Sequence, residues 1–137
     1  MVSKKRNTFE WGRLKMAGIK IKQGEELNGL GEMLKEIIDG NLKDPKKYRS
    51  VERLKASVVI REATSGVAIT LHFKQGEVEI QNDAVDEPTA CMEAGFENLA
   101  YISSGQLSPI KAILTGKLKA SGNLLTLLKI SSITVLK

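Results

Sequence analysis

The sequence contains few cysteine, proline and aromatic residues. Its 137 residues include one cysteine, three prolines and only 4% aromatic residues. The single cysteine, Cys91, excludes an intrachain disulfide and gives no indication of an oxidising compartment. Because aromatic side chains are so few, any core or cavity must be built from Leu, Ile, Val, Ala and Met, a lining that suits flexible aliphatic molecules better than planar ones.

Long apolar segments are also missing. No apolar run approaches the ~20 residues that a membrane-spanning helix needs. The basic N-terminus is not followed by the apolar segment of a secretory signal peptide, and Val135-Leu136-Lys137 is not a peroxisomal signal. We therefore expect a cytoplasmic protein with one globular domain.

The net charge of +5 is unevenly distributed. Residues 1–24 carry seven basic residues and one acidic residue, whereas the rest of the chain is close to neutral. The sequence thus predicts a basic extension over 1–24 and a domain over 25–137. The extension suits transient contact with an anionic membrane surface, because basic side chains and Trp favour that interface; a solubilising tail is the alternative. The predicted membrane contacts are Lys4, Lys5, Arg6, Trp11, Arg13 and Lys15.

Hydrophobic periodicity predicts the elements of the domain. Leucines and isoleucines at helical spacing predict a helix from Glu25 to Gly40. Period-2 alternation with short turns then predicts three antiparallel strands, followed by a short fourth strand. These strands are expected at 54–61, 67–74, 77–81 and 89–93.

The C-terminal third alternates short helices with one strand. A helix is expected at 96–103, and Ser108-Pro109 is a typical N-cap and first residue of another helix that ends at Gly116. A fifth strand over 117–121 and a leucine-rich helix over 124–130 follow. The fold class is therefore α+β: a mixed, mostly antiparallel five-stranded sheet with helices mainly on one face.

One region resembles a known family. The segments Pro88–Glu93, Phe96, Gly105–Pro109 and, most specifically, Gly116–Asn123 (GKLKASGN) are similar to the sterol carrier protein-2 (sterol-binding domain) family. The chain resembles a stand-alone prokaryotic-type member, over roughly residues 25–130. The resemblance implies a non-catalytic protein that binds and transfers lipid in an apolar tunnel.

The resemblance also indicates where a ligand would lie. Leucines nearly encircle the last helix, which is typical of a helix that is buried on most sides or lines a cavity. The implied guest is a fatty acyl chain, acyl-CoA, phospholipid or sterol, and the low aromatic content favours the acyl chain. The predicted cavity residues are Leu99, Ile102, Leu107, Ile110, Ile113, Leu114, Leu118, Leu124, Leu125 and Leu128.

Other features favour ordinary structural roles. The only histidine, His72, lies at a polar strand position without metal-ligand or triad partners nearby in sequence. Gly116-Lys117 lacks the preceding frame of a phosphate loop. We therefore expect no enzyme activity, cofactor, metal or nucleic-acid partner. The alternative function is a protein-interaction module with a closed apolar core and no bound lipid.

Overall fold

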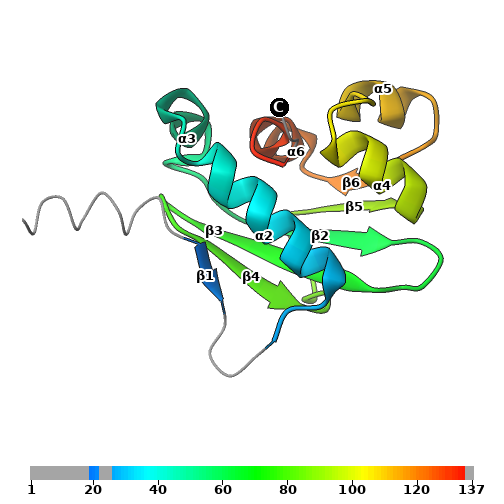
Figure 1. The fold of residues 1–137 in the computed structure, drawn as a ribbon, viewed down its shortest axis with the longest axis horizontal. Coiled ribbons are helices and arrows are strands. Elements are labelled where there is room, and N and C mark those ends of the chain that lie inside the picture. The colour runs from blue at the N-terminus through cyan, green and yellow to red at the C-terminus, as the bar shows by residue number, and fades with distance from the viewer. Residues whose placement is uncertain (1–18, 22–25, 135–137) are drawn as a thin grey trace, which may run out of the picture.

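The computed structural model of the chain describes residues 19–21 and 26–134. It contains one six-stranded sheet, and the described helices lie on one side of that sheet (Figure 1). The predicted α+β class with helices on one face is confirmed. Along the chain the elements are β1 Ile19–Ile21, α2 Gly29–Asn41, α3 Pro45–Val51, β2 Lys55–Glu62, β3 Ala68–Lys74, β4 Val78–Asn82, β5 Ala90–Ala94, α4 Phe96–Ser103, α5 Pro109–Leu114, β6 Lys119–Gly122 and α6 Leu124–Ser131.

The strands are ordered β1-β4-β3-β2-β5-β6. As predicted, β2, β3 and β4 form an antiparallel meander. The chain then crosses to the other side of β2, where β5 pairs in parallel, and β6 pairs antiparallel with β5. This crossing brings the GKLKASGN region to the sheet edge opposite β1.

The prediction of five strands was one short. Ile19–Ile21, which the sequence assigned to the N-terminal extension, forms β1 and pairs in parallel with β4, with Lys20 opposite Glu79. A three-residue strand is too short to show a period, and its partner is distant in sequence. At least these three residues of the predicted extension therefore belong to the sheet.

Asparagine and aspartate caps define where the first two helices begin. α2 begins at Gly29 rather than Glu25, because Asn28 Oδ1 accepts a hydrogen bond from Gly31 N at 2.8 Å, while Asn28 Nδ2 donates to Ala68 O at 3.1 Å. The sequence patterns predict no element between the helix that ends at Gly40 and the strand at 54–61, whereas the structure has α3 there. Asp44 in fact caps α3, and Pro45 occupies the first helical position.

The core lies between the helices and the inner face of the sheet. Ile38 of α2, Leu71 of β3, Ile80 of β4 and Ile130 of α6 are fully buried there. A buried hydrogen bond from Asn41 Nδ2 to Ile133 O, at 2.8 Å, joins the end of α2 to the segment after α6. Within the described part of the chain, no helix is long and apolar enough to cross a membrane.

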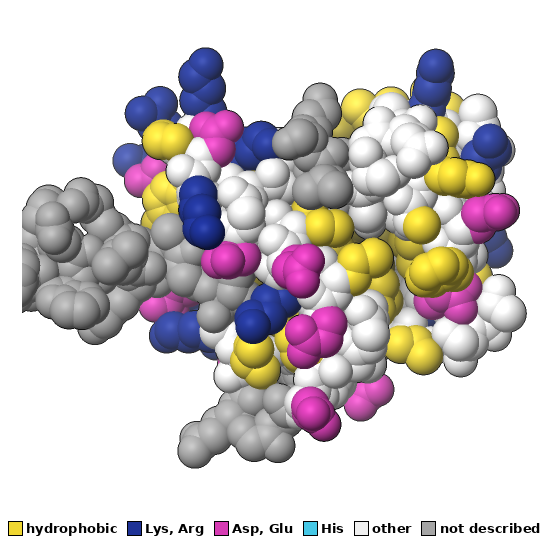
Figure 2. Space-filling model, in the orientation of Figure 1, with side chains coloured by type: hydrophobic (Ala, Val, Ile, Leu, Met, Phe, Trp, Pro, Cys, Tyr) yellow, Lys and Arg dark blue, Asp and Glu magenta, His cyan; other side chains and the backbone are white. Residues whose placement is uncertain are grey.

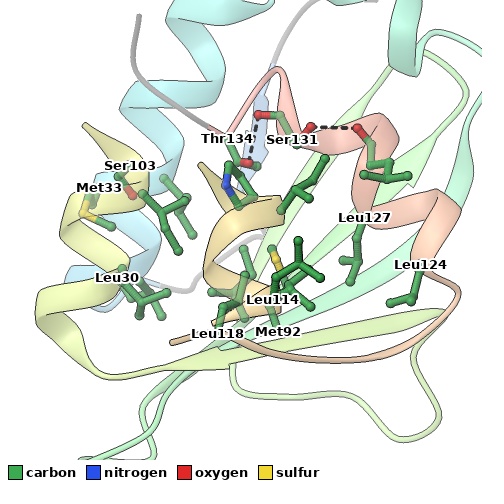
Figure 3. A pocket seen from close by; sticks show the side chains of 18 residues that line it. Leu30, Met33, Met92, Ser103, Leu114, Leu118, Leu124, Leu127, Ser131 and Thr134 are labelled. Atoms are coloured by element: carbon green, nitrogen blue, oxygen red, sulfur yellow. Dashed lines mark hydrogen bonds between the residues drawn. The ribbon is translucent and has the colours of Figure 1, made fainter. Parts of the chain in front are cut away.

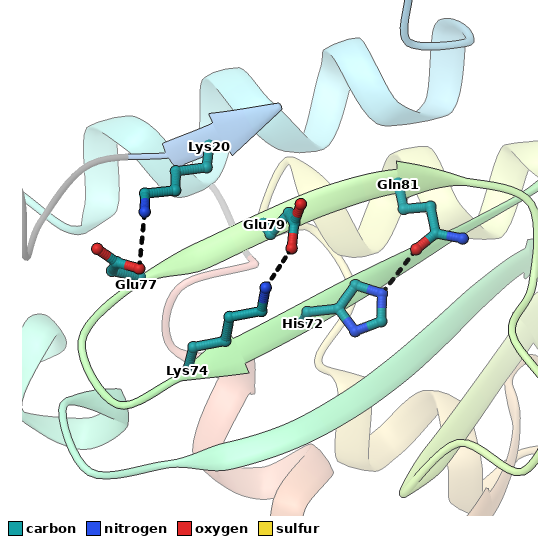
Figure 4. Close-up of polar contacts among 6 residues, drawn as sticks. All are labelled: Lys20, His72, Lys74, Glu77, Glu79 and Gln81. Carbon is teal, nitrogen blue, oxygen red and sulfur yellow. Dashed lines mark hydrogen bonds and ion pairs between the residues drawn. The ribbon is translucent and has the colours of Figure 1, made fainter. Parts of the chain in front are cut away.

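The outer face of the sheet is polar where β3 and β4 meet (Figure 4). The His72 ring nitrogen Nε2 lies 2.9 Å from Gln81 Oε1 on the adjacent strand. Lys74 pairs with Glu79 on the same two strands. The interpretation of His72 as a sheet-face residue is confirmed.

Candidate functional site

An apolar cavity of about 280 Å³ lies between the helical layer and the sheet (Figure 3). Its wall combines side chains from α2, β2, β5, α4, α5 and α6, elements that are far apart in the sequence. Some lining residues have almost no surface exposed to solvent, so they form the inner part of the cavity. They include Leu34, Ile60, Leu99, Leu118 and Leu127.

The cavity opens between α5 and α6. Four of its lining residues are about half exposed or more: Ile110 at 52%, Leu114 at 79%, Leu124 at 51% and Leu128 at 47%. A side chain that lines a cavity and also meets solvent lies at the opening. These four residues are called the mouth below, and their side chains make its rim entirely apolar.

Among the described residues, the polar side chains that line the cavity are three hydroxyl groups. Ser131 Oγ donates to Leu128 O at 2.8 Å, and Thr134 Oγ1 donates to Ile130 O at 3.2 Å. Ser103 is only 8% exposed, and within residues 19–21 and 26–134 nothing accepts or donates a hydrogen bond at its hydroxyl. Ser103 and Met33 both line the cavity, and Figure 3 shows Ser103 well separated from Leu124.

This lining determines the chemistry of a guest. Among the residues that the structure describes, no ionisable side chain lines the cavity. Burying an isolated ionised group without a partner is strongly unfavourable, whereas a hydroxyl can pair with a neutral polar group. The cavity therefore suits hydrocarbon, and a charged headgroup would have to stay outside or at the mouth.

Local hydrogen bonds hold the two short helices of the mouth. The Ser108 hydroxyl accepts from Lys111 N at the start of α5. Asn123 Oδ1 accepts from the backbone N–H groups of Leu125 and Thr126 at the start of α6, at 3.0 and 3.3 Å. Both caps are residue types that satisfy the free N–H groups of a helix start. Local sequence thus sets where each wall of the mouth begins.

The glycine before α6 is required by a close approach. Gly122 has a φ of +84°, and a Cβ at this position would lie 2.5 Å from the Thr89 carbonyl oxygen. The same carbonyl accepts a hydrogen bond from Asn123 N at 2.9 Å. The Gly-Asn pair that ends the GKLKASGN segment therefore lets the chain pass tightly over the start of β5 and then caps α6.

Most of the predicted cavity residues come together in the structure. Two do not line the cavity: Leu107 packs partly buried against the core, and Leu125 points outward from α6 with 68% of its surface exposed. On α6, the side that faces the cavity is occupied by Leu124, Leu127 and Leu128 instead. The predicted residues that line the cavity are Leu99, Ile102, Ile110, Ile113, Leu114, Leu118, Leu124 and Leu128.

The sequence missed the contribution of the N-terminal half of the domain. α2 adds Leu30, Met33 and Leu34, while β2 adds Ile60 and β5 adds Met92. The spacing of the leucines and isoleucines predicts an apolar face on this helix. Such a face can line a cavity, but it can equally pack in an ordinary hydrophobic core. Only the packing of α2 over β3 and β4, which leaves part of its apolar face at the cavity, distinguishes the two roles.

The predicted membrane contacts Lys4, Lys5, Arg6, Trp11, Arg13 and Lys15 lie outside the described residues. They remain a prediction. A membrane-facing surface can therefore be sought in the structure only among residues 19–21 and 26–134.

A second hollow lies on the outer face of the sheet, below the loop from Ala84 to Pro88. It has a volume of about 360 Å³, but it is shallow, and Arg61, Asp86 and Glu87 contribute charged groups to its wall. Burial raises the pKa of the Cys91 thiol beside it, which favours the unreactive protonated form. Among the described residues, no three His, Cys, Asp or Glu side chains are grouped to hold a metal ion.

Solved structures with a similar fold share low sequence identity with this chain. The structure of a UbiJ-SCP2 ubiquinone synthesis protein has a TM-score of 0.59 at 15% identity, covering 77% of this chain and 85% of that one. The apo form of sterol carrier protein 2 from Yarrowia lipolytica has a TM-score of 0.59 at 15% identity, covering 80% and 93%. These likenesses establish the fold.

A third structure is the palmitated SCP2L2 of Aedes aegypti. Its TM-score is 0.52 at 18% identity, and the match covers 72% of this chain and 92% of that one. No curated protein matches the sequence. The sequence does match the SCP-2 sterol transfer family over residues 34–135, from the middle of α2 to beyond α6. The chain therefore belongs to the SCP-2 sterol transfer family, and its function is lipid binding or transfer in the general sense of that family.

Proposed function

We propose that this domain binds the hydrocarbon chain of a fatty acyl lipid in the cavity between α4, α5, α6 and the sheet, and performs no covalent chemistry on it. The observation that carries the proposal is the cavity itself, lined by aliphatic side chains and three hydroxyl groups. Apolar burial at about 25 cal/mol per Å² makes such a lining favourable for hydrocarbon. The palmitated state of SCP2L2 from Aedes aegypti supports an acyl guest in this fold.

The size of the cavity favours a flexible chain. At about 280 Å³ it lies just below the ~300–1,000 Å³ that is usual for ligand pockets. A chain with many rotatable bonds can follow an irregular wall of leucines and methionines, whereas a rigid ring system must find a matching shape. Met33 and Met92, with their unbranched side chains, can adapt to the guest.

The lipid would enter tail first. An ionised carboxylate has no charged partner inside the cavity, so it stays in water at the mouth while the tail passes between α5 and α6. The headgroup would then contribute little to recognition. Lipids that share a tail but differ in headgroup are therefore expected to bind with similar affinity, which suits a carrier of several lipids.

The first experiment is native mass spectrometry of freshly purified protein, followed by solvent extraction and identification of any bound molecule. The expected result is one acyl lipid per chain. A bare mass that persists after incubation with fatty acids would contradict the proposal and favour the alternative, an interaction module with a closed apolar core.

A chain-length series then tests whether the tail is the part recognised. Each buried methylene contributes about 0.8 kcal/mol, so the Kd should fall roughly fourfold for each added carbon until the cavity is full. Saturated fatty acids of increasing length would be titrated at one pH. An affinity that does not depend on chain length would show that the tail is not buried.

A further inference from the structure

The mouth of the cavity exposes several large apolar side chains to solvent. Ile110, Leu114, Leu124 and Leu128 line the opening and meet solvent, and Leu125 lies beside them on the outer side of α6. Figure 2 shows hydrophobic side chains grouped on the helical side of the molecule, around α4 and α5. Exposed apolar groups that gather in one place are typical of an interaction site.

The segment that carries α4, α5 and α6, and with them the mouth, has a positive net charge. Residues 96–134 carry four lysines and a single acidic residue, Glu97, whereas residues 26–95 carry nine basic and thirteen acidic residues. All four lysines are exposed, and two of them adjoin mouth residues: Lys111 follows Ile110 on α5, and Lys129 follows Leu128 on α6. The four are Lys111, Lys117, Lys119 and Lys129.

We infer that the mouth, together with Leu125, Lys111 and Lys129, is the docking surface through which the domain sits on an anionic lipid bilayer. The inference rests on the proposed function and extends it to the place where lipid is exchanged. Leucines at a bilayer interface bury their side chains among acyl groups, while lysines beside them pair with anionic headgroups. Positive charge beside an apolar opening fits that occupant.

The position of the opening supports the same conclusion. A lipid tail that leaves through the mouth into water exposes all of its apolar surface, which is unfavourable. Release into water is therefore expected to be slow. When the mouth faces a bilayer, the tail passes from one hydrocarbon environment to another. A docking surface anywhere else on the domain would leave this aqueous step in the path.

The experiment uses the full chain, so that residues 1–24 are present in every sample. Binding is measured to vesicles of phosphatidylcholine with phosphatidylglycerol, and to vesicles of phosphatidylcholine alone, by co-sedimentation. One variant is Leu125→Asp, and the other combines Lys111→Glu with Lys129→Glu. Each removes a feature of the docking surface, and none of these three residues lines the cavity.

Matched controls make the same chemical changes elsewhere. Val67→Asp replaces an exposed aliphatic residue in the turn between β2 and β3. Lys43→Glu with Lys55→Glu reverses two exposed charges, one just after α2 and one at the start of β2, outside α5 and α6. The charge control matters because it changes the net charge of the protein by the same amount as the α5–α6 variant.

The expected result is that wild type and controls bind the anionic vesicles, while both mouth-side variants bind them at least tenfold more weakly. A basic residue near an anionic surface contributes roughly fivefold in affinity, so reversing two of them exceeds that threshold. Transfer of a fluorescent fatty acid to the vesicles should slow in parallel. Uptake of the same fatty acid in the absence of vesicles should be unchanged for Leu125→Asp. For the double variant, the matching control is uptake of an uncharged acyl ligand, which the two added carboxylates beside the mouth do not repel, and it should also be unchanged.

Three outcomes would overturn the inference. Wild type could fail to bind anionic vesicles, or the mouth-side variants could bind them as well as wild type does. The wild type could also form a dimer in solution that Leu125→Asp dissociates, in which case a second copy of the chain covers this surface. If the wild type took up no fatty acid in the absence of vesicles, that result would contradict the proposed function. Failure of the docking inference and failure of the proposed function are therefore distinguishable.

Discussion

Leu125 and Leu128 lie about one turn apart on α6, yet only Leu128 lines the cavity. Leu128→Asp is therefore expected to weaken fatty acid uptake by tenfold or more. It removes an aliphatic contact worth about 1 kcal/mol for a half-exposed leucine, and it places a carboxylate at the mouth, beside the hydrocarbon and the charge of the fatty acid. Since Leu128 is already half exposed, the protein should still fold. The measurement is a fluorescent fatty acid titration without vesicles.

Leu125→Asp is the matched control for that prediction. It introduces the same carboxylate at an exposed position of the same helix, outside the cavity lining. Uptake should stay within about twofold of wild type. If the two variants behave alike, in either direction, the assignment of the cavity wall along α6 is wrong.

The buried Ser103 hydroxyl predicts an effect on stability. A buried hydroxyl without a hydrogen-bond partner is unfavourable, so Ser103→Ala should raise the free energy of unfolding of the lipid-free protein by about 1 kcal/mol. The measurement is urea unfolding after delipidation. Ser104→Ala, at the exposed neighbouring position, should change stability by less than ~0.5 kcal/mol. A destabilised Ser103→Ala protein would mean that the hydroxyl is satisfied.

Two glycines predict opposite responses to alanine. Gly122→Ala should destabilise the protein by more than ~2 kcal/mol, because the residue has positive φ and its new Cβ would collide with the Thr89 carbonyl oxygen. Gly40→Ala should stabilise it by about 0.5–1 kcal/mol, since Gly40 lies near the end of α2 with open space around it. Thermal and urea unfolding of both variants provide the comparison. Equal effects would contradict the backbone geometry at Gly122.

Glu62 predicts part of the acid sensitivity of the fold. Hydrogen bonds from Ser65, first from its side chain and then from its backbone, and from the Thr64 backbone lower the pKa of Glu62 from 4.5 to about 2. As the pH falls, the unfolded chain takes up this proton before the folded protein does. The stabilisation by Glu62 is therefore complete above about pH 4.5 and is lost between that pH and about 2.

The corresponding variant is Glu62→Gln, compared with wild type by urea unfolding from pH 6 down to pH 2.5. The stability difference between the two proteins should be largest at pH 6 and should shrink as the pH falls through this window. Taking the difference removes the effect of the other carboxylates. A difference that stays constant with pH would show that the Glu62 charge does not contribute.

Local patterns predicted most elements because each depends on nearby residues. The helix at 96–103 matches α4 to the residue, and Ser108-Pro109 marked the start of α5 correctly. Two elements were not predicted: α3 is marked by its cap Asp44 and by Pro45 rather than by apolar periodicity, and β1, with three residues, carries no period. α2 begins later than the predicted Glu25 because the side chain of Asn28 caps it.

The sequence by itself determined the class of the fold, the cap of α5 at Ser108 and the excess of leucine in the last third of the chain. Those features follow from backbone propensities and from the need to bury aliphatic side chains. It did not determine which leucines face the cavity, since Leu124, Leu125, Leu127 and Leu128 surround most of α6. The tertiary structure decided that by packing α6 against the core through Leu127 and Ile130, which turned Leu124 and Leu128 to the opening and left Leu125 outside. A helix that is apolar on most sides has no preferred orientation until its neighbours are present, so this choice required the whole fold.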